Sequence, residues 1–357
     1  RTGRLFPKVH YSSIYANGRR FTHSSGFNAA HIRDWNLRRG SRVKITISGD
    51  VIPVLSEVKE PENPKLAAEE YSLPPETPEW KWQGKDIVLV DPENNPDVLK
   101  ARILYFWQVL GVRGLADKTV DKFYEAGYTS VNSIAALPSG SSIQSVLFPN
   151  SKSITTGLKI YNNIHSTLRT VRFDRLIPAT GIFKNLGRKL IKDVLKYIPG
   201  MFIEPSATLK KDLDEIKIPG IAAKRKEALV EGVPKVLEFL QGLSSEDFVI
   251  ALANEKKRIA LLEKTPKNEL IDGKQFVFTG FHSNLNYELE DYIYDNGGNI
   301  SSVVISQTGA LICKNILDLS KKMELANELK IPILTVHEFV KKFRIPFETS
   351  EEEFIEE

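Results

Sequence analysis

The stretch GVRGLADKTVDKFYEAG at residues 111–127 reads as the end of one helix, a tight corner and the start of a second helix. The corner is the small–apolar–small triplet Gly114-Leu115-Ala116, and Asp117 and Lys118 open the second helix. Three approximate copies follow: FPNSKSITTGLKIYNNI (148–164) around Ser151–Ile154, ATGIFKNLGRKLIKDVLKYI (179–198) with Gly181 and Gly187, and KIPGIAAKRKEALVEGV (217–233) with Gly220-Ile221-Ala222. Four related corners indicate an internal helical repeat within a helical domain at residues 98–265.

The chemistry of such a corner suits a phosphate group. The first amides of the second helix have no partner inside that helix, and small residues let an anion approach them. The residues at the approach are Gly114, Ala116, Gly181, Gly187 and Gly220. The basic side chains just past the corners are Lys118, Lys152, Arg188, Lys189, Lys224 and Arg225. The repeat therefore predicts binding to the backbone of duplex DNA, without reading of its sequence.

A competing interpretation stays open for the individual copies. For any single copy, an ordinary helical hairpin closed by glycine is the simpler explanation. The copies at 148–157 and 218–226 are the least regular, and a purely structural role fits them as well.

Residues 1–60 alternate short β-like runs with Gly and Asn turns. RVKITISGDVIPVLSEV (42–58) has the period-2 pattern of a strand, then a turn and a second apolar run, whereas FNAAHIRDWN (27–36) reads as a short helix. This pattern predicts a small β-barrel, and eleven Lys and Arg against four acids predict that it binds nucleic acid. The basic candidates are Arg4, Arg19, Arg20, Arg38 and Arg39. For any one of them, a solvated surface position is the simpler interpretation.

The remaining segments differ in character. Residues 61–97 are rich in Pro and Glu and read as a linker followed by a small irregular module. Residues 266–345 alternate strands and helices, which predicts a parallel sheet flanked by helices. Residues 346–357 form an acidic tail. The predicted fold class is therefore multidomain α+β.

Charge and composition narrow the function. The net charge is +4, but residues 346–357 hold six acids and no Lys or Arg, so residues 1–345 carry +10 and favour a polyanionic partner. No HExxH, P-loop, GxGxxG or GxSxG motif is present, so no catalytic or metal constellation is predicted. The single cysteine, Cys313, predicts a buried strand residue and a reducing, cytoplasmic compartment rather than secretion. No apolar run is long enough to cross a membrane.

Taken in order, these segments resemble the C-terminal half of NAD-dependent DNA ligases. The segments that carry the resemblance are RTGRLFPKV (1–9), SSGFNAAHI (24–32) with its Asn28, ISGDVIPVL (47–55), the four helical corners, and GKQFVFTGF (273–281) with the α/β pattern after it. The resemblance implies an oligonucleotide-binding (OB) fold at 1–60, a zinc-finger-like module at 61–97, four helix-hairpin-helix motifs at 98–265 and a BRCT domain at 266–345. It also adds Asn28 to the residues expected to contact DNA.

One departure from the family concerns zinc. The family carries a four-cysteine zinc finger between the barrel and the hairpins. Here Thr77 and Trp80 stand where its first cysteine pair would be, and DPENNPD (91–97) stands near the second. We therefore expect no zinc in this chain, with Trp80 and Trp82 packing on the strand IVLV (87–90) in its place.

The second departure concerns the reaction. The family's adenylation domain, with its nucleophilic lysine, precedes the barrel, and this sequence does not contain it. The resemblance implies a DNA-gripping part with no catalytic residue of its own, whose partner adenylation subunit supplies the lysine, NAD and Mg²⁺. The residues expected to face a nick in the DNA are Arg1, Thr2, Gly49, Asp50, Val51 and Ile52. The missing zinc ligands and the divided polypeptide suggest a virus- or phage-encoded enzyme.

Two alternatives stay open. The chain could be a non-enzymatic DNA-binding scaffold with a partner-binding BRCT domain. In phosphopeptide-binding BRCT relatives, a Ser/Thr-Gly pair ends the first strand and a Lys begins the second helix, which resembles Thr279, Gly280, Lys321 and Lys322 here. Single ligase BRCT modules mostly serve DNA or partner contacts, so phosphopeptide binding is the weaker of these readings.

Overall fold

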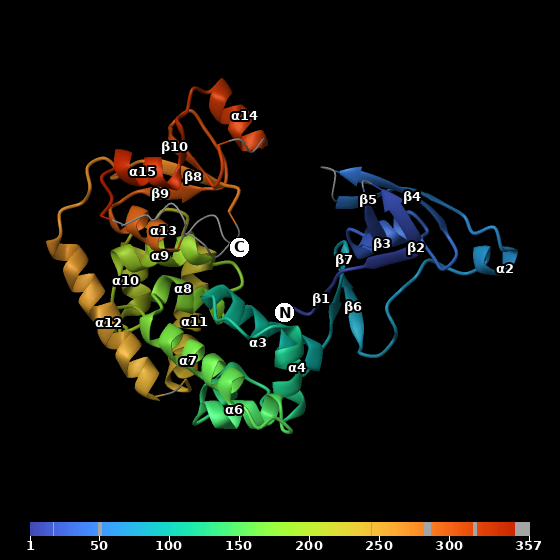
Figure 1. The fold of residues 1–357 in the computed structure, drawn as a ribbon, viewed down its shortest axis with the longest axis horizontal. Helices are drawn as coiled ribbons and strands as arrows, with labels where there is room; N and C mark the ends of the chain where they lie inside the picture. Colours follow the sequence, from blue (N-terminus) through green and yellow to red (C-terminus); the bar gives the residue numbers. More distant parts are fainter. Residues whose placement is uncertain (17, 49–51, 244, 282–286, 317–319, 347–357) are drawn as a thin grey trace. The chain divides into compact units, whose positions relative to one another are not determined.

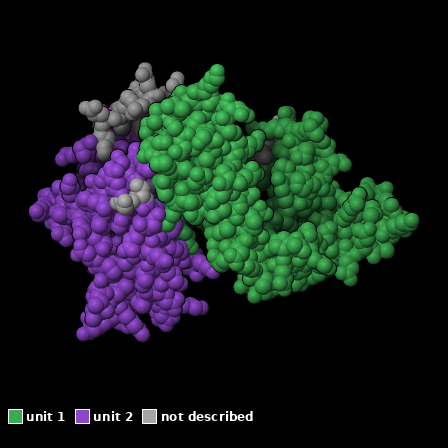
Figure 2. Space-filling model, turned by 90° about the horizontal axis from the view of Figure 1, so that it is seen from below, with its two compact units in different colours: residues 1–108, 113–163, 179–181 green, residues 109–112, 164–178, 182–357 purple. Residues whose placement is uncertain are grey.

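A computed structural model gives the structure of the chain and describes residues 1–16, 18–48, 52–243, 245–281, 287–316 and 320–346. The protein is a mixed α/β structure (Figure 1). It divides into two compact units (Figure 2). Unit 1 contains residues 1–108, 113–163 and 179–181, and unit 2 contains residues 109–112, 164–178 and 182–357. The predicted acidic tail, from residue 347 onward, lies outside the described residues.

A half-barrel of four strands opens unit 1. Its strands are β2 (Lys8–Ala16), β3 (Arg19–Ser25), β4 (Arg42–Ser48) and β5 (Ile52–Lys59), in the order β2-β3-β5-β4. Strands β4 and β5 pair antiparallel from Arg42 opposite Lys59 to Ser48 opposite Ile52, which confirms the predicted hairpin. Helix α1 (Ala29–Asp34) supplies Ile32 to a buried centre that also contains Leu37 and Leu55.

A second, three-stranded sheet joins β1 (Arg4–Leu5), β6 (Trp80–Gln83) and β7 (Asp86–Leu89) in the order β1-β7-β6. The small β-barrel predicted for residues 1–60 therefore does not include β1, whose backbone pairs antiparallel with β7 instead. Trp80 lies opposite Leu89 and Trp82 opposite Ile87, so the predicted packing of both tryptophans on this strand is confirmed as cross-strand pairing. The linker before the sheet contains the short helix α2 (Pro64–Ala67).

Helices make up the rest of unit 1. They are α3 (Pro96–Leu110), α4 (Asp117–Glu125), α5 (Val131–Ala135), α6 (Gly140–Leu147) and α7 (Thr155–Thr170), with the division between the units falling inside α3 and α7. Phe106 and Trp107 of α3 and Phe123 of α4 are fully buried. Helices α6 and α7 cross at Gly140 and Gly157, so closely that a Cβ atom on Gly157 would lie 2.2 Å from the carbonyl oxygen of Gly140.

Unit 2 continues the helical region. Its helices are α8 (Phe173–Ala179), α9 (Arg188–Tyr197), α10 (Leu209–Glu215), α11 (Ala223–Gln241) and α12 (Ser245–Lys264). Helix α9 buries Ile191, Val194 and Leu195 on one face, which leaves its lysines on the other faces. The helical character predicted for residues 98–265 is confirmed.

A parallel sheet ends the described chain. Its strands β8 (Gln275–Thr279), β9 (Asn299–Ser301), β10 (Thr308–Cys313) and β11 (Ile333–Thr335) follow the order β11-β10-β8-β9, and every pairing is parallel, as predicted. Alternate side chains separate the two faces. Phe276 and Ile312 pack with α13 (Tyr287–Asp295) and α15 (Val336–Lys342), whereas Val277, Leu311 and the buried Cys313 pack with α14 (Lys321–Glu328).

Candidate nucleic-acid interface

Three of the four predicted corners share one backbone geometry. The residues before α4, α9 and α11 are Ala116, Gly187 and Ala222, with φ of −98°, −75° and −82° and ψ of 173°, 174° and 173°. None of the three gives its helix a side-chain cap, so the first amides of each helix are available to an anion. The middle residue of each triplet is buried: Leu115, Leu186 and Ile221 anchor the corner while the small residue after it stays exposed.

A lysine occupies the same place in each of these helices. Lys118, Lys189 and Lys224 are each the second residue of their helix, and all three are exposed. The third triplet is Asn185-Leu186-Gly187. Gly181, which was predicted at this corner, lies in an earlier turn that belongs to unit 1. For the copy at 218–226, the sequence also allowed a purely structural role. Its backbone geometry is nevertheless the same as that of the copy at 111–127.

The copy at 148–157 is built differently. The hydroxyl of Ser153 accepts a hydrogen bond from the amide of Thr155 at 3.4 Å, and the hydroxyl of Ser151 accepts one from the amide of Ser153 at 3.2 Å. Serine side chains therefore satisfy amides that the other corners leave open. Lys152 is exposed, but the local geometry favours the structural interpretation of this copy.

Each unit pairs one corner with a neighbouring helix through a glycine. Gly114 (φ +91°) lies against α7, where a Cβ atom would be 2.8 Å from Ile160, and Gly220 (φ +76°) lies against α9, where it would be 3.0 Å from Leu190. Glycine is required at both corners because of the positive φ and the close approach. Unit 2 also contains a groove of about 610 Å³ between residues 182–186 and 222–235.

The groove adds two basic residues that the sequence reasoning missed. Lys184 and Lys235 line it together with Lys224 and Arg225. Lys184 precedes its corner, and Lys235 lies three turns into α11, so a search confined to residues just past the corners could not find them. The spacing within α11 could have identified Lys235. Lys224, Ala228, Glu231 and Lys235 recur at helical spacing and so lie along one face of the helix.

Several residues that were expected to contact DNA make structural contacts within the fold. Arg38 is buried and donates to the carbonyls of Ala67 and Glu69, so it ties the half-barrel to the linker. Asn28 caps α1 by accepting from the amide of His31. Arg225 donates to the carbonyl of Gly220 at 2.5 Å and so fastens its own corner.

The other basic residues of the first sixty keep surface positions. Arg4 is exposed and pairs with Asp86 at 3.1 Å. Arg19 and Arg39 are exposed, and Arg20 donates to the hydroxyl of Ser13 at 2.9 Å. Their assignment to DNA stays a prediction.

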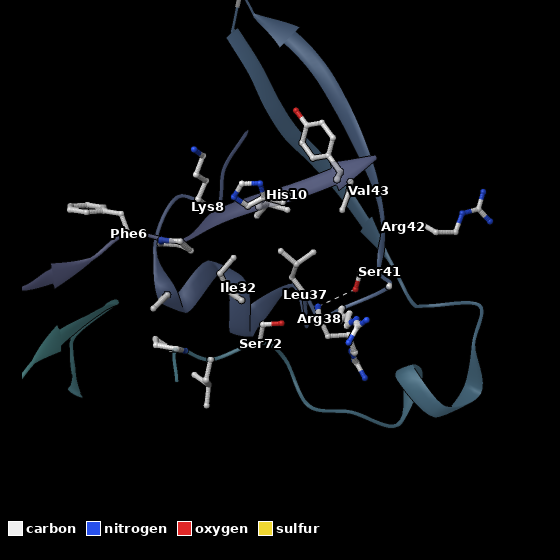
Figure 3. Close-up of a pocket in the computed structure, with 18 of the residues that line it drawn as sticks. Phe6, Lys8, His10, Ile32, Leu37, Arg38, Ser41, Arg42, Val43 and Ser72 are labelled. Atoms are coloured by element: carbon white, nitrogen blue, oxygen red, sulfur yellow. Dashed lines mark hydrogen bonds between the residues drawn. The ribbon is translucent and has the colours of Figure 1, made fainter. Parts of the chain in front are cut away.

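The half-barrel encloses a hollow between its two edge strands (Figure 3). The cavity has a volume of about 1050 Å³, with Val9, Ile32, Leu37 and other apolar side chains in its wall. Lys8, His10 and Arg42 stand around it, and the amide of Arg38 donates to the hydroxyl of Ser41 at 3.1 Å.

The residues expected to face a nick are only partly described. Gly49, Asp50 and Val51 lie outside the described residues. Ile52 is 60 % exposed, and Thr2 is exposed. The guanidinium of Arg1 lies 3.7 Å from the centre of the Tyr105 ring.

A dense ionic cluster surrounds the start of α9. Arg188, predicted to bind phosphate, bonds to Asp174 at 3.3 Å, to Glu290 at 2.8 Å and also to Asp291. Arg172 bonds to Asp174 at 3.1 Å and holds Asp295 with both terminal nitrogens at 2.8 and 2.9 Å. Arg188 is therefore not a free phosphate ligand, because it is already bonded to carboxylates of α13.

Burial changes the titration of this cluster. Burial raises the pKa of Asp174, but attraction from Arg172 and Arg188 outweighs it and holds that pKa at about 2. Burial, aided by Arg172, lowers the pKa of Lys192 to about 7 despite the carboxylates of Asp174 and Asp295. The Lys192 ammonium lies 3.8 Å from the centre of the Tyr294 ring, and no hydrogen-bond partner is found for it among the described groups.

This lowered pKa predicts a pH-dependent stability. Below pH 7 Lys192 is charged in both states, whereas between pH 7 and 10.5 only the unfolded chain binds the proton, so the free energy of unfolding rises with pH in that window. We expect this rise, at most about 1.4 kcal/mol per pH unit, in the native sequence and not in Lys192→Met. Urea unfolding between pH 6.5 and 9 measures it. Lys196→Met, on the exposed side of α9, should keep the native slope, and equal slopes for all three proteins would contradict the assignment.

The predicted phosphopeptide residues lie near one another. The hydroxyls of Thr279 and Ser320 are 3.3 Å apart, Gly280 has φ +79°, and Lys321 begins α14. The ammonium of Lys322, however, donates to the carbonyl of Phe278 at 3.0 Å, which fastens α14 to the sheet.

Comparison with known proteins fits this architecture. Residues 266–341 match the BRCA1 C Terminus (BRCT) domain family. A DNA ligase of Acanthamoeba polyphaga mimivirus is 25% identical over 347 residues, covering 96% of this chain and 51% of the relative. A DNA ligase of Carboxydothermus hydrogenoformans is 26% identical over 373 residues, covering 95% and 49%. A DNA ligase of Desulfatibacillum aliphaticivorans is 24% identical over 350 residues, covering 95% and 51%.

The chain thus spans about half the length of the curated relatives it matches. Among the helices that the structure describes, none combines the length and apolarity needed to cross a membrane. The chain carries a BRCT domain at residues 266–341 and, over nearly its whole length, is a homologue of DNA ligases, consistent with their C-terminal half.

Proposed function

We propose that this chain grips nicked duplex DNA as the C-terminal half of an NAD-dependent DNA ligase. In this proposal the half-barrel is an OB fold, residues 61–97 are a finger-like module without zinc, and the helical region is an array of helix-hairpin-helix motifs. The observation that carries it is the threefold repetition of an uncapped helix start with an exposed lysine in second place. Similarity to DNA ligases along nearly the whole chain supports it.

The division of labour follows from the residues. We assign the nucleophilic lysine, NAD and Mg²⁺ to an adenylation domain outside these 357 residues, which transfers AMP to the 5′-phosphate before the 3′-hydroxyl displaces the AMP. This chain binds the phosphates that flank the nick and holds the two ends in line, which is a contribution of positioning. Arg1, Thr2 and Ile52 are the described residues that we assign to the nick.

A sealing assay tests the proposal. The chain is mixed with nicked duplex, Mg²⁺ and NAD, alone and with a separately produced adenylation-domain chain. We expect sealed product only with both chains and NAD, and none when ATP replaces NAD. Sealing by this chain alone would overturn the division of labour. Salt-dependent DNA binding without sealing in any mixture would support the non-enzymatic scaffold instead.

The role of the corner lysines has its own test. Lys118→Gln and Lys224→Gln each remove one phosphate contact, so each should flatten the slope of log K against log salt by about 0.9 on nicked duplex. Fluorescence anisotropy from 50 to 200 mM salt measures the slope. Lys257→Gln, an exposed position on α12, makes the same charge change away from the corners and should leave the slope close to native. Equal effects of all three variants would mean that charge acts without a defined contact.

A further inference from the structure

Helix α13 of the BRCT domain is strongly acidic. Its sequence YELEDYIYD carries four acids and no basic residue. Glu290, Asp291 and Asp295 all point at cations of the helical region, since each is bonded to an arginine of residues 172–188. Figure 1 shows α13 beside α9 in the same unit.

Among the cations that α13 covers, Arg188 belongs to the third corner, whereas Arg175 lies on α8. Arg188 is the first residue of α9, directly after the uncapped Gly187, where α4 has Asp117 and α11 has Ala223. Arg175 reaches Asp291 at 2.7 Å, and only 14 % of its side chain is exposed. The third corner therefore combines the backbone geometry of its two counterparts with extra positive charge that carboxylates already occupy.

The joint between α13 and the helical region is ionic. Among the described residues, a buried cluster of the BRCT domain is formed by side chains between residues 271 and 345, with none from α8 or α9. The joint contains ion pairs whose side chains are about one-seventh to one-quarter exposed, and the Lys192 ammonium lies on the ring of Tyr294 beside them. Salt screens such largely buried pairs only weakly, so a competing polyanion has to replace them charge for charge.

Further cations stay within reach beside the joint. A cavity of about 520 Å³ lies between α9 and residues 294–299, and Lys189, Lys196 and Lys267 line it. Lys189 is the exposed second residue of α9, the position that the other corners also give to lysine. A phosphate that binds Lys189 would lie next to the carboxylates of α13 and repel them.

We propose that the acidic face of α13 is an internal mimic of the DNA backbone, which occupies the third corner until duplex DNA displaces it. The proposal rests on the proposed function, because it names the regulation of the same interface. DNA and the BRCT domain then compete for Arg188 and its neighbours. The apparent affinity for DNA is lowered by the fraction of molecules in which the corner is covered.

Neutralising α13 tests the competition. In the full chain, Glu290→Gln with Asp291→Asn should bind nicked duplex about three- to tenfold more tightly at 100 mM salt, because the covered state loses its ion pairs. The slope against salt should steepen, since freed cations now meet phosphates, and the two proteins should converge at high salt. Glu324→Gln with Glu328→Gln on the exposed face of α14 makes the same charge change and should bind close to the native level.

A second variant separates competition from simple charge. Arg175→Gln removes a positive charge, which by general electrostatics weakens DNA binding. If α13 is a competitor, the loss of the Arg175–Asp291 pair loosens it, and the variant binds DNA more tightly than the native chain. Near-ultraviolet circular dichroism shows whether each variant keeps its folded core.

The outcomes separate the two proposals. The native chain could bind DNA in a salt-dependent way while neither the α13 nor the Arg175 substitutions increase the affinity. That result would overturn the mimic and leave the proposed function standing. A gain of the same size in the α14 control would also overturn the mimic, because net charge would then explain it. No salt-dependent binding by any of these proteins would overturn the proposed function itself.

Discussion

Asp174→Asn is expected to lower the free energy of unfolding of unit 2 by about 3 kcal/mol. The Asp174 side chain is 1 % exposed, and its two oxygens bond to Arg172 at 3.1 Å and Arg188 at 3.3 Å. An asparagine of the same shape removes the charge and leaves two largely buried guanidinium groups without their shared inner carboxylate. The remaining bonds to Glu290, Asp291 and Asp295 keep the loss towards the lower end of the range for a broken buried pair.

The stability contributed by Asp174 should depend on pH in a defined direction. The pKa of Asp174 is about 2 when folded, below its ordinary value of 3.8, so its contribution is fully present above pH 4 and is lost as the pH falls towards 2. The difference between the native chain and Asp174→Asn, measured by urea unfolding, should therefore shrink over that interval.

Asp193→Asn is the matched control for this substitution. Burial raises the pKa of Asp193, on the neighbouring helix α9, so its charge does not favour folding, and its neutralisation should be neutral or slightly stabilising. Equal losses for Asp174→Asn and Asp193→Asn would show that the cluster is not organised around Asp174.

The corners could be predicted because their causes are local. Gly114-Leu115-Ala116 and Gly220-Ile221-Ala222 contain the positive φ, the buried anchor and the small exposed residue in three consecutive positions. The parallel BRCT sheet was equally predictable from the sequence, because Phe276 and Val277 alternate between two packed faces. Period and turn chemistry need no knowledge of distant contacts.

Which basic residues bond to acceptors within the chain could not be predicted from the sequence. Arg188 looks identical to a phosphate ligand until Glu290 and Asp291, about a hundred residues later, are placed beside it. Arg38 likewise finds its acceptors in the linker, at Ala67 and Glu69. Counting Lys and Arg along the chain therefore overstates the positive charge that reaches the surface, and the surplus in residues 1–345 is partly consumed by internal pairs.

Gly157→Ala is expected to destabilise unit 1 by about 3 kcal/mol or more. A Cβ atom at this position would lie 2.2 Å from the carbonyl oxygen of Gly140 and 2.6 Å from the amide nitrogen of Gln144. Both atoms belong to the backbone of α6, so no side-chain rotation relieves the contact and the helices must separate. Separation also breaks the buried hydrogen bond from the amide of Gly157 to the Gln144 side chain, which is 2.8 Å long.

The better helix propensity of alanine is too small to compensate for the steric clash at residue 157. Alanine improves helix propensity over glycine by about 1 kcal/mol, less than the overpacking and the lost hydrogen bond together. Because α7 also carries Ile160, which packs against Gly114, the displacement should loosen the first corner and weaken DNA binding as well. Thermal unfolding together with hydrogen exchange of α6 and α7 measures the effect.

Gly200→Ala is the control for the crossing of α6 and α7. Its backbone is outside the positive-φ region, and the nearest atom to the added Cβ would be 4.0 Å away, so its stability should stay near native. If Gly157→Ala were as stable as Gly200→Ala, the two helices would not be locked at Gly140. The first corner would then be held by α4 and its own triplet, without support from α7.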